Sequence, residues 1–226
     1  MRELNPKRRK RTRQIRQRQL RRRKNLSFQQ LSADEAGAVA EQEMEAKSVR
    51  KRLRLFGAIG HDRRTIEVCI HGIRFKSIIG KLRECFPNET LEILDEGAGR
   101  SNLKKWLMRR FKGLRVTTTD VCEGRWWPMP KHPDEIVNVL NLVKSFGKNR
   151  FHLVVSTVGG AWHSPVPEKA FFQIVSVLKP GGIGVVSAKI SNERLKQLAK
   201  RFNLTIKQHY ADSIVFSKNF GRAKKR

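Results

Sequence analysis

The stretch that decides the fold covers residues 94–103 and reads Leu94-Asp95-Glu96-Gly97-Ala98-Gly99-Arg100-Ser101-Asn102-Leu103. A short apolar strand is expected at residues 91–94, and residues 103–111 carry apolar side chains at helical spacing. A glycine-rich turn between a strand and a helix is the context that a nucleotide-binding loop requires. Gly97 and Gly99 would allow a sharp backbone turn and a close approach of a ligand. The alternative is a tight strand–helix connection that binds nothing.

A second feature supports the binding interpretation. A β-branched strand is expected at residues 116–119, and it ends in Thr119-Asp120. Asp120 follows the glycines by about 20 residues, the distance at which an acidic residue holds ribose hydroxyls in dinucleotide-binding folds. Alone, this pair would indicate an ordinary turn at a strand end. The spacing favours a nucleotide site.

The rest of the chain alternates between strand and helix patterns. We expect strands at 151–156 and 183–188, helices at 136–146, 170–178 and 193–202, and a closing strand pair at 204–209 and 213–217. Such alternation predicts an α/β fold with a mostly parallel sheet covered by helices on both faces. Upstream, Ser32 and Glu35 form a capping-box pattern that opens a helix reaching about Leu55. Residues 64–86 predict another helix, ended by Pro87 and Asn88.

Several segments together resemble the motifs of class I S-adenosylmethionine (SAM) dependent methyltransferases, in particular the branch called the methyltransferase-11 type. The glycine turn resembles the first motif, and the later matches lie in the right order: residues 151–156, 167–170, 174–182 and 185–187. Within them, the Leu-Lys-Pro-Gly-Gly sequence at 178–182 is expected to be a turn before an apolar strand. The resemblance covers about residues 90–190. It implies a Rossmann-like, seven-stranded-type sheet and SAM as the cofactor.

The resemblance also implies roles for individual residues. Gly97 and Gly99, with Ala98 between them, would line the methionine and ribose side of SAM, and Asp120 would hold the ribose hydroxyls. Asp95 or Glu96 would stand near the methionine amino group. Residues near the adenine and at the mouth of the methyl-donor site would be Cys122, Glu123, Ser156 and His163. Ser156 is also a candidate cofactor contact, and Ser156 and His163 are the candidate catalytic residues. No metal site is expected.

The sequence also departs from the family pattern. The third glycine is replaced by Ser101, and the strand at 151–156 ends in Ser156 without the Asn/Asp-Pro-Pro-aromatic motif of enzymes that methylate adenine or cytosine amines. The lysine–aspartate–lysine–glutamate set of many ribose 2′-O-methyltransferases is not evident either. SAM binding is therefore better supported by the sequence than any particular methyl transfer.

The positive net charge of the chain indicates what kind of partner it binds. The chain of 226 residues has 49 Lys and Arg against 20 acidic residues, a formal net charge of +29, and its first 24 residues hold 13 basic residues and one acidic residue. Such a balance attracts nucleic acid because neutralised phosphates release counterions. The basic N-terminal arm, residues 1–25, and the basic helices that follow it would bind RNA phosphates. Aromatic side chains beside Arg125 would either stack on bases or pack as a lid over the sheet. The expected RNA-contacting residues are Arg8, Arg9, Arg11, Arg21, Arg22, Arg23, Arg125, Trp126 and Trp127.

We therefore expect four regions: a basic disordered arm at 1–25, a helical extension at 26–88, a SAM-binding domain at 89–219 and a basic tail at 220–226. Three widely spaced cysteines predict a reducing, intracellular compartment: the cytoplasm, or the nucleus, nucleolus or mitochondrion in a eukaryote. The function expected is SAM-dependent methylation of a structured RNA, ribosomal or transfer RNA. The alternative is a non-catalytic RNA-binding protein of the same fold in ribosome or ribonucleoprotein assembly.

Overall fold

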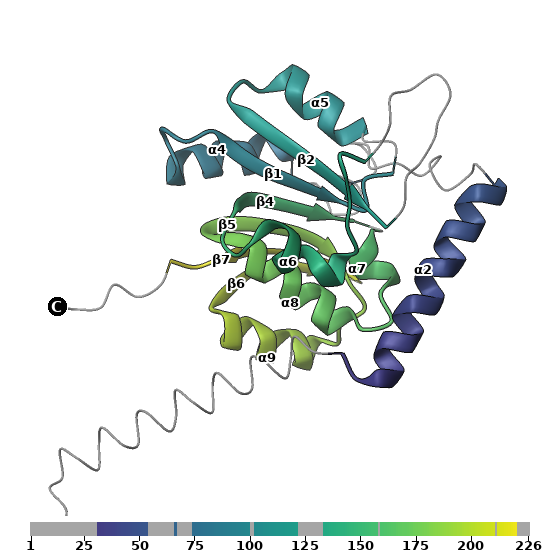
Figure 1. Cartoon of the computed structure of the whole chain (residues 1–226). Coiled ribbons are helices and arrows are strands. Elements are labelled where there is room, and N and C mark those ends of the chain that lie inside the picture. Colours follow the sequence, from purple (N-terminus) through teal and green to yellow (C-terminus); the bar gives the residue numbers. More distant parts are fainter. Residues whose placement is uncertain are drawn as a thin grey trace, which may run out of the picture. The chain divides into compact units, whose positions relative to one another are not determined.

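The fold is described from a computed structural model that covers residues 31–53, 66, 74–99, 102–121, 133–157, 159–210 and 212–220. The chain divides into two units, Met1–Ala38 and Val39–Arg226, and the sheet with its helices belongs to the second. Figure 1 labels the elements. The strands are β1 (Leu91–Glu96), β2 (Leu114–Asp120), β3 (Glu135–Ile136), β4 (Phe151–Ser156), β5 (Leu178–Ser187), β6 (Leu204–Tyr210) and β7 (Ser213–Lys218). The helices are α2 (Ala33–Leu53), α4 (Phe75–Cys85), α5 (Asn102–Arg110), α6 (Leu142–Phe146), α7 (Gly160–His163), α8 (Pro167–Val177) and α9 (Asn192–Phe202).

The strands form one seven-stranded sheet in the order β3-β2-β1-β4-β5-β7-β6. All neighbouring pairs are parallel except those of β7, which runs antiparallel to both β5 and β6. The strand order reverses direction between β1 and β4, which is where open α/β sheets bind ligands at the carboxyl ends of their strands. The predicted mostly parallel α/β sheet is confirmed, and its topology places the glycine turn at this reversal.

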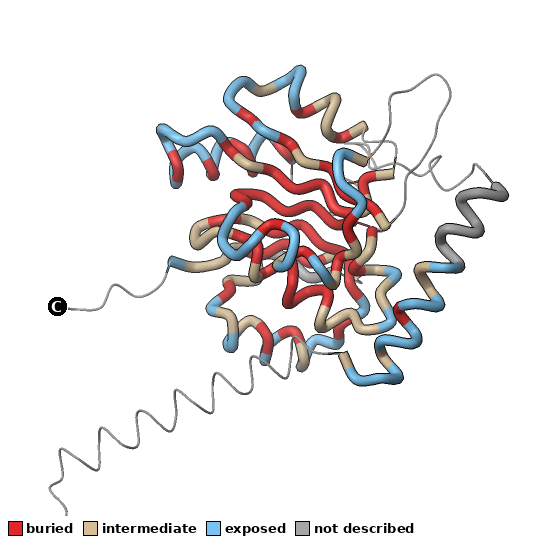
Figure 2. Tube along the Cα trace, viewed as in Figure 1, coloured by how far each residue is buried: buried red, intermediate tan, exposed pale blue. Residues whose placement is uncertain are grey.

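Helices cover both faces of the sheet (Figure 1). On one face α4 and α5 bury Phe75, Ile79, Leu82, Leu103 and Leu107 against the inward side chains of the strands. The other face carries α6 and α8, where the Phe171 ring lies 5.1 Å from that of Phe216 on β7. The central strands are buried along almost their whole length (Figure 2), as expected for parallel strands that are covered on both sides.

Buried polar contacts hold the amino end of the sheet, opposite the glycine turn. His152 on β4 is fully buried, and its Nδ1 accepts a hydrogen bond of 2.8 Å from the backbone N–H of Glu92 on β1. The ring edge of Phe86 packs against the imidazole. These contacts tie β4 to β1, so the register of the two strands that flank the topological reversal is set at both ends.

The capping box is confirmed. The Glu35 backbone N–H donates to Ser32 Oγ at 3.2 Å, and the Ser32 N–H donates to Glu35 Oε2 at 2.8 Å. The helix that follows ends at Leu53, close to the predicted end. Within the helix predicted at 64–86, α4 begins at Phe75 and is capped at Phe86, while residues 67–73 lie outside the described part of the chain.

Two sequence predictions are wrong. Residues 136–146 do not form one helix: Ile136 lies in β3 beside β2 and is exposed, a 3-10 turn covers Val139–Asn141, and only Leu142–Phe146 is α-helical. The Asn138 side chain accepts the Leu140 N–H and so starts the turn locally. The Leu-Lys-Pro-Gly-Gly segment is not a separate turn, because β5 already starts at Leu178, which pairs with Phe151 before the register shifts.

Candidate cofactor-binding site

The glycine turn leaves the carboxyl end of β1 and is tied to the neighbouring strand. Gly97 and Gly99 adopt positive φ angles of 69° and 51°, which side chains other than glycine rarely adopt. The Ala98 N–H donates to the Thr119 carbonyl at 3.0 Å, and the Gly99 N–H donates to Asp120 Oδ2 at 3.2 Å. The turn thus has one defined path, with its backbone held against the end of β2.

A second glycine pair packs against this turn from the other side. A Cβ placed on Gly97 would lie 2.5 Å from the Cα of Gly159 and 3.0 Å from the N of Gly160. Gly159 and Gly160 belong to the loop after β4, which ends at Ser156, so the loops that follow β1 and β4 touch backbone to backbone. Two features therefore require glycine at position 97: the positive φ angle and the close contact with the Gly159–Gly160 backbone.

Glu96 connects the same two loops through its side chain. Its carboxylate is fully buried, and Oε2 accepts hydrogen bonds from the Ser156 hydroxyl at 2.5 Å and from the Gly160 N–H at 3.1 Å. A Cβ on Gly160 would overlap Glu96 Oε1 at 2.2 Å, so the carboxylate fits against the glycine. Glu96 and Ser156 thus fix the geometry between the ends of β1 and β4.

Asp120 lies at the carboxyl end of β2, as predicted, and is almost completely buried. Its Oδ1 accepts from the Val121 N–H at 2.8 Å, and its Oδ2 accepts from Gly99. The carboxylate therefore stands beside the glycine turn.

Sequence reasoning missed Asp134, which fixes the outer edge of this region. Its carboxylate accepts from the Thr118 N–H at 2.7 Å, from the Thr118 hydroxyl at 2.8 Å and from Lys104 Nζ at 2.7 Å. Burial raises the pKa of this carboxyl, but the hydrogen bonds from Lys104 and Thr118 outweigh it, so the pKa lies below its ordinary value. Asp134 thereby joins α5, β2 and the start of β3. The sequence feature that could have identified Asp134 is its position as an acidic residue between Pro133 and a short strand.

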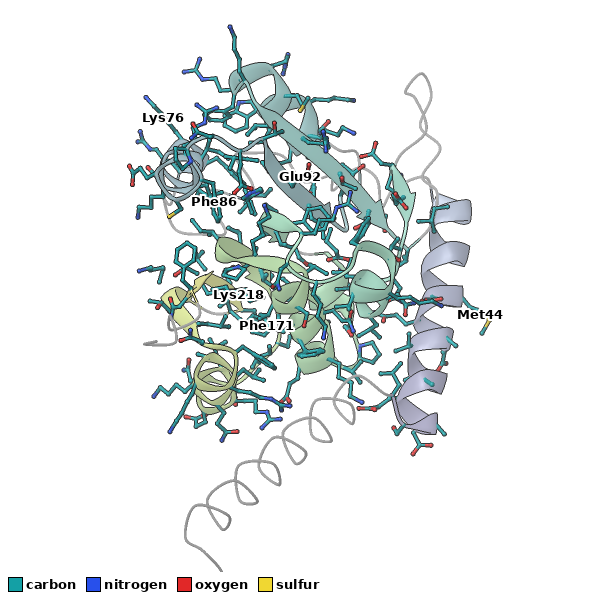
Figure 3. All side chains as sticks on the ribbon, turned by 60° about the vertical axis from the view of Figure 1, so that its left-hand side comes forward. Met44, Lys76, Phe86, Glu92, Phe171 and Lys218 are labelled. Atoms are coloured by element: carbon teal, nitrogen blue, oxygen red, sulfur yellow. The ribbon has the colours of Figure 1, made fainter. Side chains whose placement is uncertain are left out.

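The other predicted residues lie in different settings. Asp95 is fully buried, and strand alternation places it on the same face as Ile93, the face that α4 and α5 cover, opposite to Glu96. His163 is exposed at the end of the short helix α7. Trp162, beside it, is half-buried, with Lys189 Nζ 5.0 Å from its ring centre. Figure 3 shows the side chains of the described residues.

The remaining predicted contacts lie outside the described residues. They are Arg8, Arg9, Arg11, Arg21, Arg22, Arg23, Cys122, Glu123, Arg125, Trp126 and Trp127. Among the residues that are described, no cluster of three His, Cys, Asp or Glu side chains could hold a metal ion. In the same part of the chain, no helix combines the length and the apolar character needed to span a bilayer.

Comparisons with known proteins give structural matches only. No family model matches the chain, and neither does any curated protein. Among solved structures, it is similar to a putative SAM-dependent methyltransferase from Methanococcus maripaludis, with 15% identity, 80% of this chain and 93% of that chain covered, and a TM-score of 0.42. Human methyltransferase-like protein 13 shares 12% identity over 67% of this chain and 84% of its own, with a TM-score of 0.42.

The matches to other solved structures cover only part of each protein. It covers 56% of the [4+2]-cyclase SpnF, at 15% identity, 56% of this chain and a TM-score of 0.36. The chain thus spans about half the length of several structures that it matches. The assignment of the fold rests instead on the order and direction of the strands and on the position of the glycine turn. The chain has the Rossmann-like α/β fold that its resemblance to class I methyltransferases predicts.

Proposed function

We propose that this protein binds SAM at the carboxyl ends of β1, β2 and β4 and transfers its methyl group to a structured RNA, ribosomal or transfer RNA. One observation carries the proposal: the positive-φ glycine turn after β1 is packed against Gly159–Gly160 and bonded to Asp120, at the reversal of strand order. This is the position at which folds of this type bind nucleotide ligands.

The residues present fit the chemistry of SAM. Asp120 stands at the carboxyl end of β2 beside the glycine turn, the position from which an acidic residue accepts ribose hydroxyls in folds of this type. Glu96 is bonded to Ser156 and Gly160. We assign contact with the methionine amino group to its neighbour Asp95, the first acid of the motif that the chain shares in pattern with class I methyltransferases. The turn carries no side chain at Gly97 or Gly99, which suits close approach of a ligand to the backbone.

When bound, SAM would supply an electrophilic methyl group with a good leaving group. The protein then has to hold the acceptor atom in line with that methyl and to exclude water. The rigid contact between the loops after β1 and β4 serves this purpose, because both loops border the proposed site. We assign to Glu96 and Ser156 the task of holding these loops, and to Trp162 and His163, at the end of the β4 loop, contact with the acceptor.

RNA as the acceptor is supported by charge. A net charge of +29 on 226 residues favours a polyanionic partner over a small metabolite, and the N-terminal arm concentrates that charge. In this proposal the arm binds phosphates without reading sequence.

One observation favours a second candidate, a non-catalytic RNA-binding protein of the same fold. Ser156 stands where a catalytic residue is expected, yet it is fully buried and donates its hydroxyl hydrogen to Glu96. A residue committed in this way maintains the fold of the site and contributes no acid or base chemistry.

Methyl transfer from radiolabelled SAM to RNA distinguishes the two candidates. Total RNA from a source organism whose own copy of the gene is deleted would serve as substrate, because its acceptor positions are unmodified. Label incorporation by the wild type, and its loss in Asp120→Ala, supports the enzyme. SAM binding without incorporation, together with tight RNA binding, supports the non-catalytic candidate.

A further inference from the structure

The helices on one face of the sheet carry an unusual excess of positive charge. Helices α4 and α5 together hold seven basic residues and one acidic residue, a net of +6, and Arg74 and Lys112 lie just outside their ends. On the opposite face, α6, α8 and α9 together hold six basic and two acidic residues, a net of +4. The charge of the folded part is therefore uneven, and it is concentrated on α4 and α5.

Six exposed cations form what we call the α4–α5 basic face: Lys76, Lys81, Arg83, Arg109, Arg110 and Lys112. Two contacts show that the helices lie side by side. The rings of Phe75 on α4 and Trp106 on α5 are 6.1 Å apart, and Arg83 Nη2 donates to the Lys112 carbonyl at 2.6 Å. The cations thus share one surface. Figure 3 shows side chains ending in nitrogen that extend outward around Lys76.

Acidic partners do not neutralise this face. Among the described residues, none of the six cations is in an ion pair, whereas Arg194 on α9 is bonded to Glu168 on α8 at 2.7 Å. Neighbouring like charges repel one another and destabilise the folded state unless counterions or a polyanion offset them.

Helix stability accounts for only part of this charge. Cations stabilise the last turn of a helix and acids stabilise the first turn. Arg83, Arg109 and Arg110 follow that rule, but Lys76 lies in the first turn of α4 and Lys104 in the first turn of α5. Neither helix has an acidic residue in its first turn, whereas α8 has Glu168 and α9 has Glu193. The opposite face keeps the ordinary arrangement that α4 and α5 lack.

We propose that the α4–α5 basic face binds the phosphate backbone of RNA, independently of the N-terminal arm. The inference rests on the proposed function in one respect, the choice of RNA as the polyanion. An anionic membrane is the less suitable partner, because a membrane-binding helix needs apolar side chains that enter the lipid. The large apolar residues of α4 are buried, and Met108 is the exposed one on α5.

The orientation of α5 shows where its part of the face lies relative to the proposed SAM site. Helix α5 starts directly after the glycine turn, at the carboxyl edge of the sheet, and ends at Arg110, shortly before the amino end of β2. Arg109, Arg110 and Lys112 lie in or just after the last turn of α5, so these three cations of the face are near the amino edge of the sheet.

A pair of triple variants of the full-length chain tests the proposal. Lys81→Ala, Arg109→Ala and Arg110→Ala remove three cations from the face and keep Arg83, which has the structural bond to Lys112. The matched variant carries Lys144→Ala, Lys196→Ala and Lys200→Ala, three exposed cations of α6 and α9. Both variants lose the same net charge, so a general electrostatic effect would weaken them equally.

The assay is fluorescence anisotropy with a labelled RNA hairpin over a range of salt concentrations. We expect the α4–α5 variant to bind roughly tenfold to hundredfold more weakly at moderate salt, and the slope of log K against log salt to fall by about 2 to 3. The matched variant should stay within about threefold of the wild type. Equal losses in both variants, or no loss in either, would overturn the proposal. So would unchanged RNA binding with a selective loss of binding to phosphatidylserine vesicles.

SAM titration by calorimetry on the same proteins separates this inference from the proposed function. Both variants should bind SAM as the wild type does, which also shows that they are folded. If no protein binds SAM but the α4–α5 variant alone loses RNA affinity, the proposed enzyme fails and the RNA-binding face stands.

Discussion

Substitution of Gly97 by alanine tests whether the loops after β1 and β4 depend on one backbone contact. Two energy terms oppose the alanine. A φ angle of 69° costs a residue with a Cβ about 1–2 kcal/mol. The Cβ would also lie 2.5 Å from the Cα of Gly159, a backbone atom that cannot rotate away, and overpacking of this kind costs about 1–3 kcal/mol. Gly97→Ala should therefore destabilise the protein by about 2–5 kcal/mol.

Gly113 supplies the matched control for the steric term. Its φ angle is 66°, close to that of Gly97, but a Cβ there would have no neighbour within 4 Å. Gly113→Ala should then lose only the conformational term, about 1–2 kcal/mol. The difference between the two variants isolates the contact between the loops.

Chemical denaturation gives both free energies, and calorimetry gives the SAM affinity of each variant. We expect Gly97→Ala to be the less stable of the two by about 1–3 kcal/mol and to lose SAM binding, while Gly113→Ala keeps it. Equal stabilities would refute the reasoning, because they would show that the loops move apart at no cost.

Three further results are expected. Glu96→Ala should destabilise the protein by about 2–4 kcal/mol and Glu96→Gln by less, because only alanine removes every acceptor for the buried Ser156 hydroxyl. A free energy of unfolding for Glu96→Ala within about 1 kcal/mol of the wild-type value would contradict this. The pKa of Asp134 is lowered, so its contribution to stability is present above the ordinary value of 3.8 and is lost as the pH falls through the lowered folded pKa; Asp134→Asn should flatten that acid limb of the stability profile. Burial, aided by the charge of Lys148, lowers the pKa of Lys218 from 10.5 to about 8, so the folded state releases a proton that the unfolded chain retains. Stability relative to Lys218→Met should therefore rise between pH 8 and 10.5, and a fall over that range would exclude this assignment.

Local patterns were sufficient where the contacts that stabilise an element are themselves local. The capping box of Ser32 and Glu35 involves residues three apart, and the helix after the glycine turn is readable from its apolar spacing. The central strands were predicted for the same reason, since each is a continuous apolar segment bounded by turn residues. The mostly parallel sheet followed from the alternation of strands with helices, whereas the order of the strands comes from the structure.

The features that the sequence did not predict depend on contacts between residues that are far apart in the chain. Ile136 lies in a strand because it pairs with Asp120 on β2. The apolar spacing around Ile136 cannot reveal this pairing, because β2 is distant in the sequence. Glu96 and Ser156 are 60 residues apart, so their hydrogen bond could not be predicted from either motif alone. Both residues were predicted as cofactor contacts. In the structure they are bonded to each other, and direct contact of either with SAM stays a prediction.

The most direct test of the account is a calorimetric titration of SAM into the full-length protein, freed of nucleic acid by a high-salt wash. The account predicts saturable binding with one site, lost in Asp120→Ala, with thermal denaturation showing that the variant remains folded. Absence of binding to the wild type at millimolar SAM would contradict it, and so would binding that Asp120→Ala leaves unchanged.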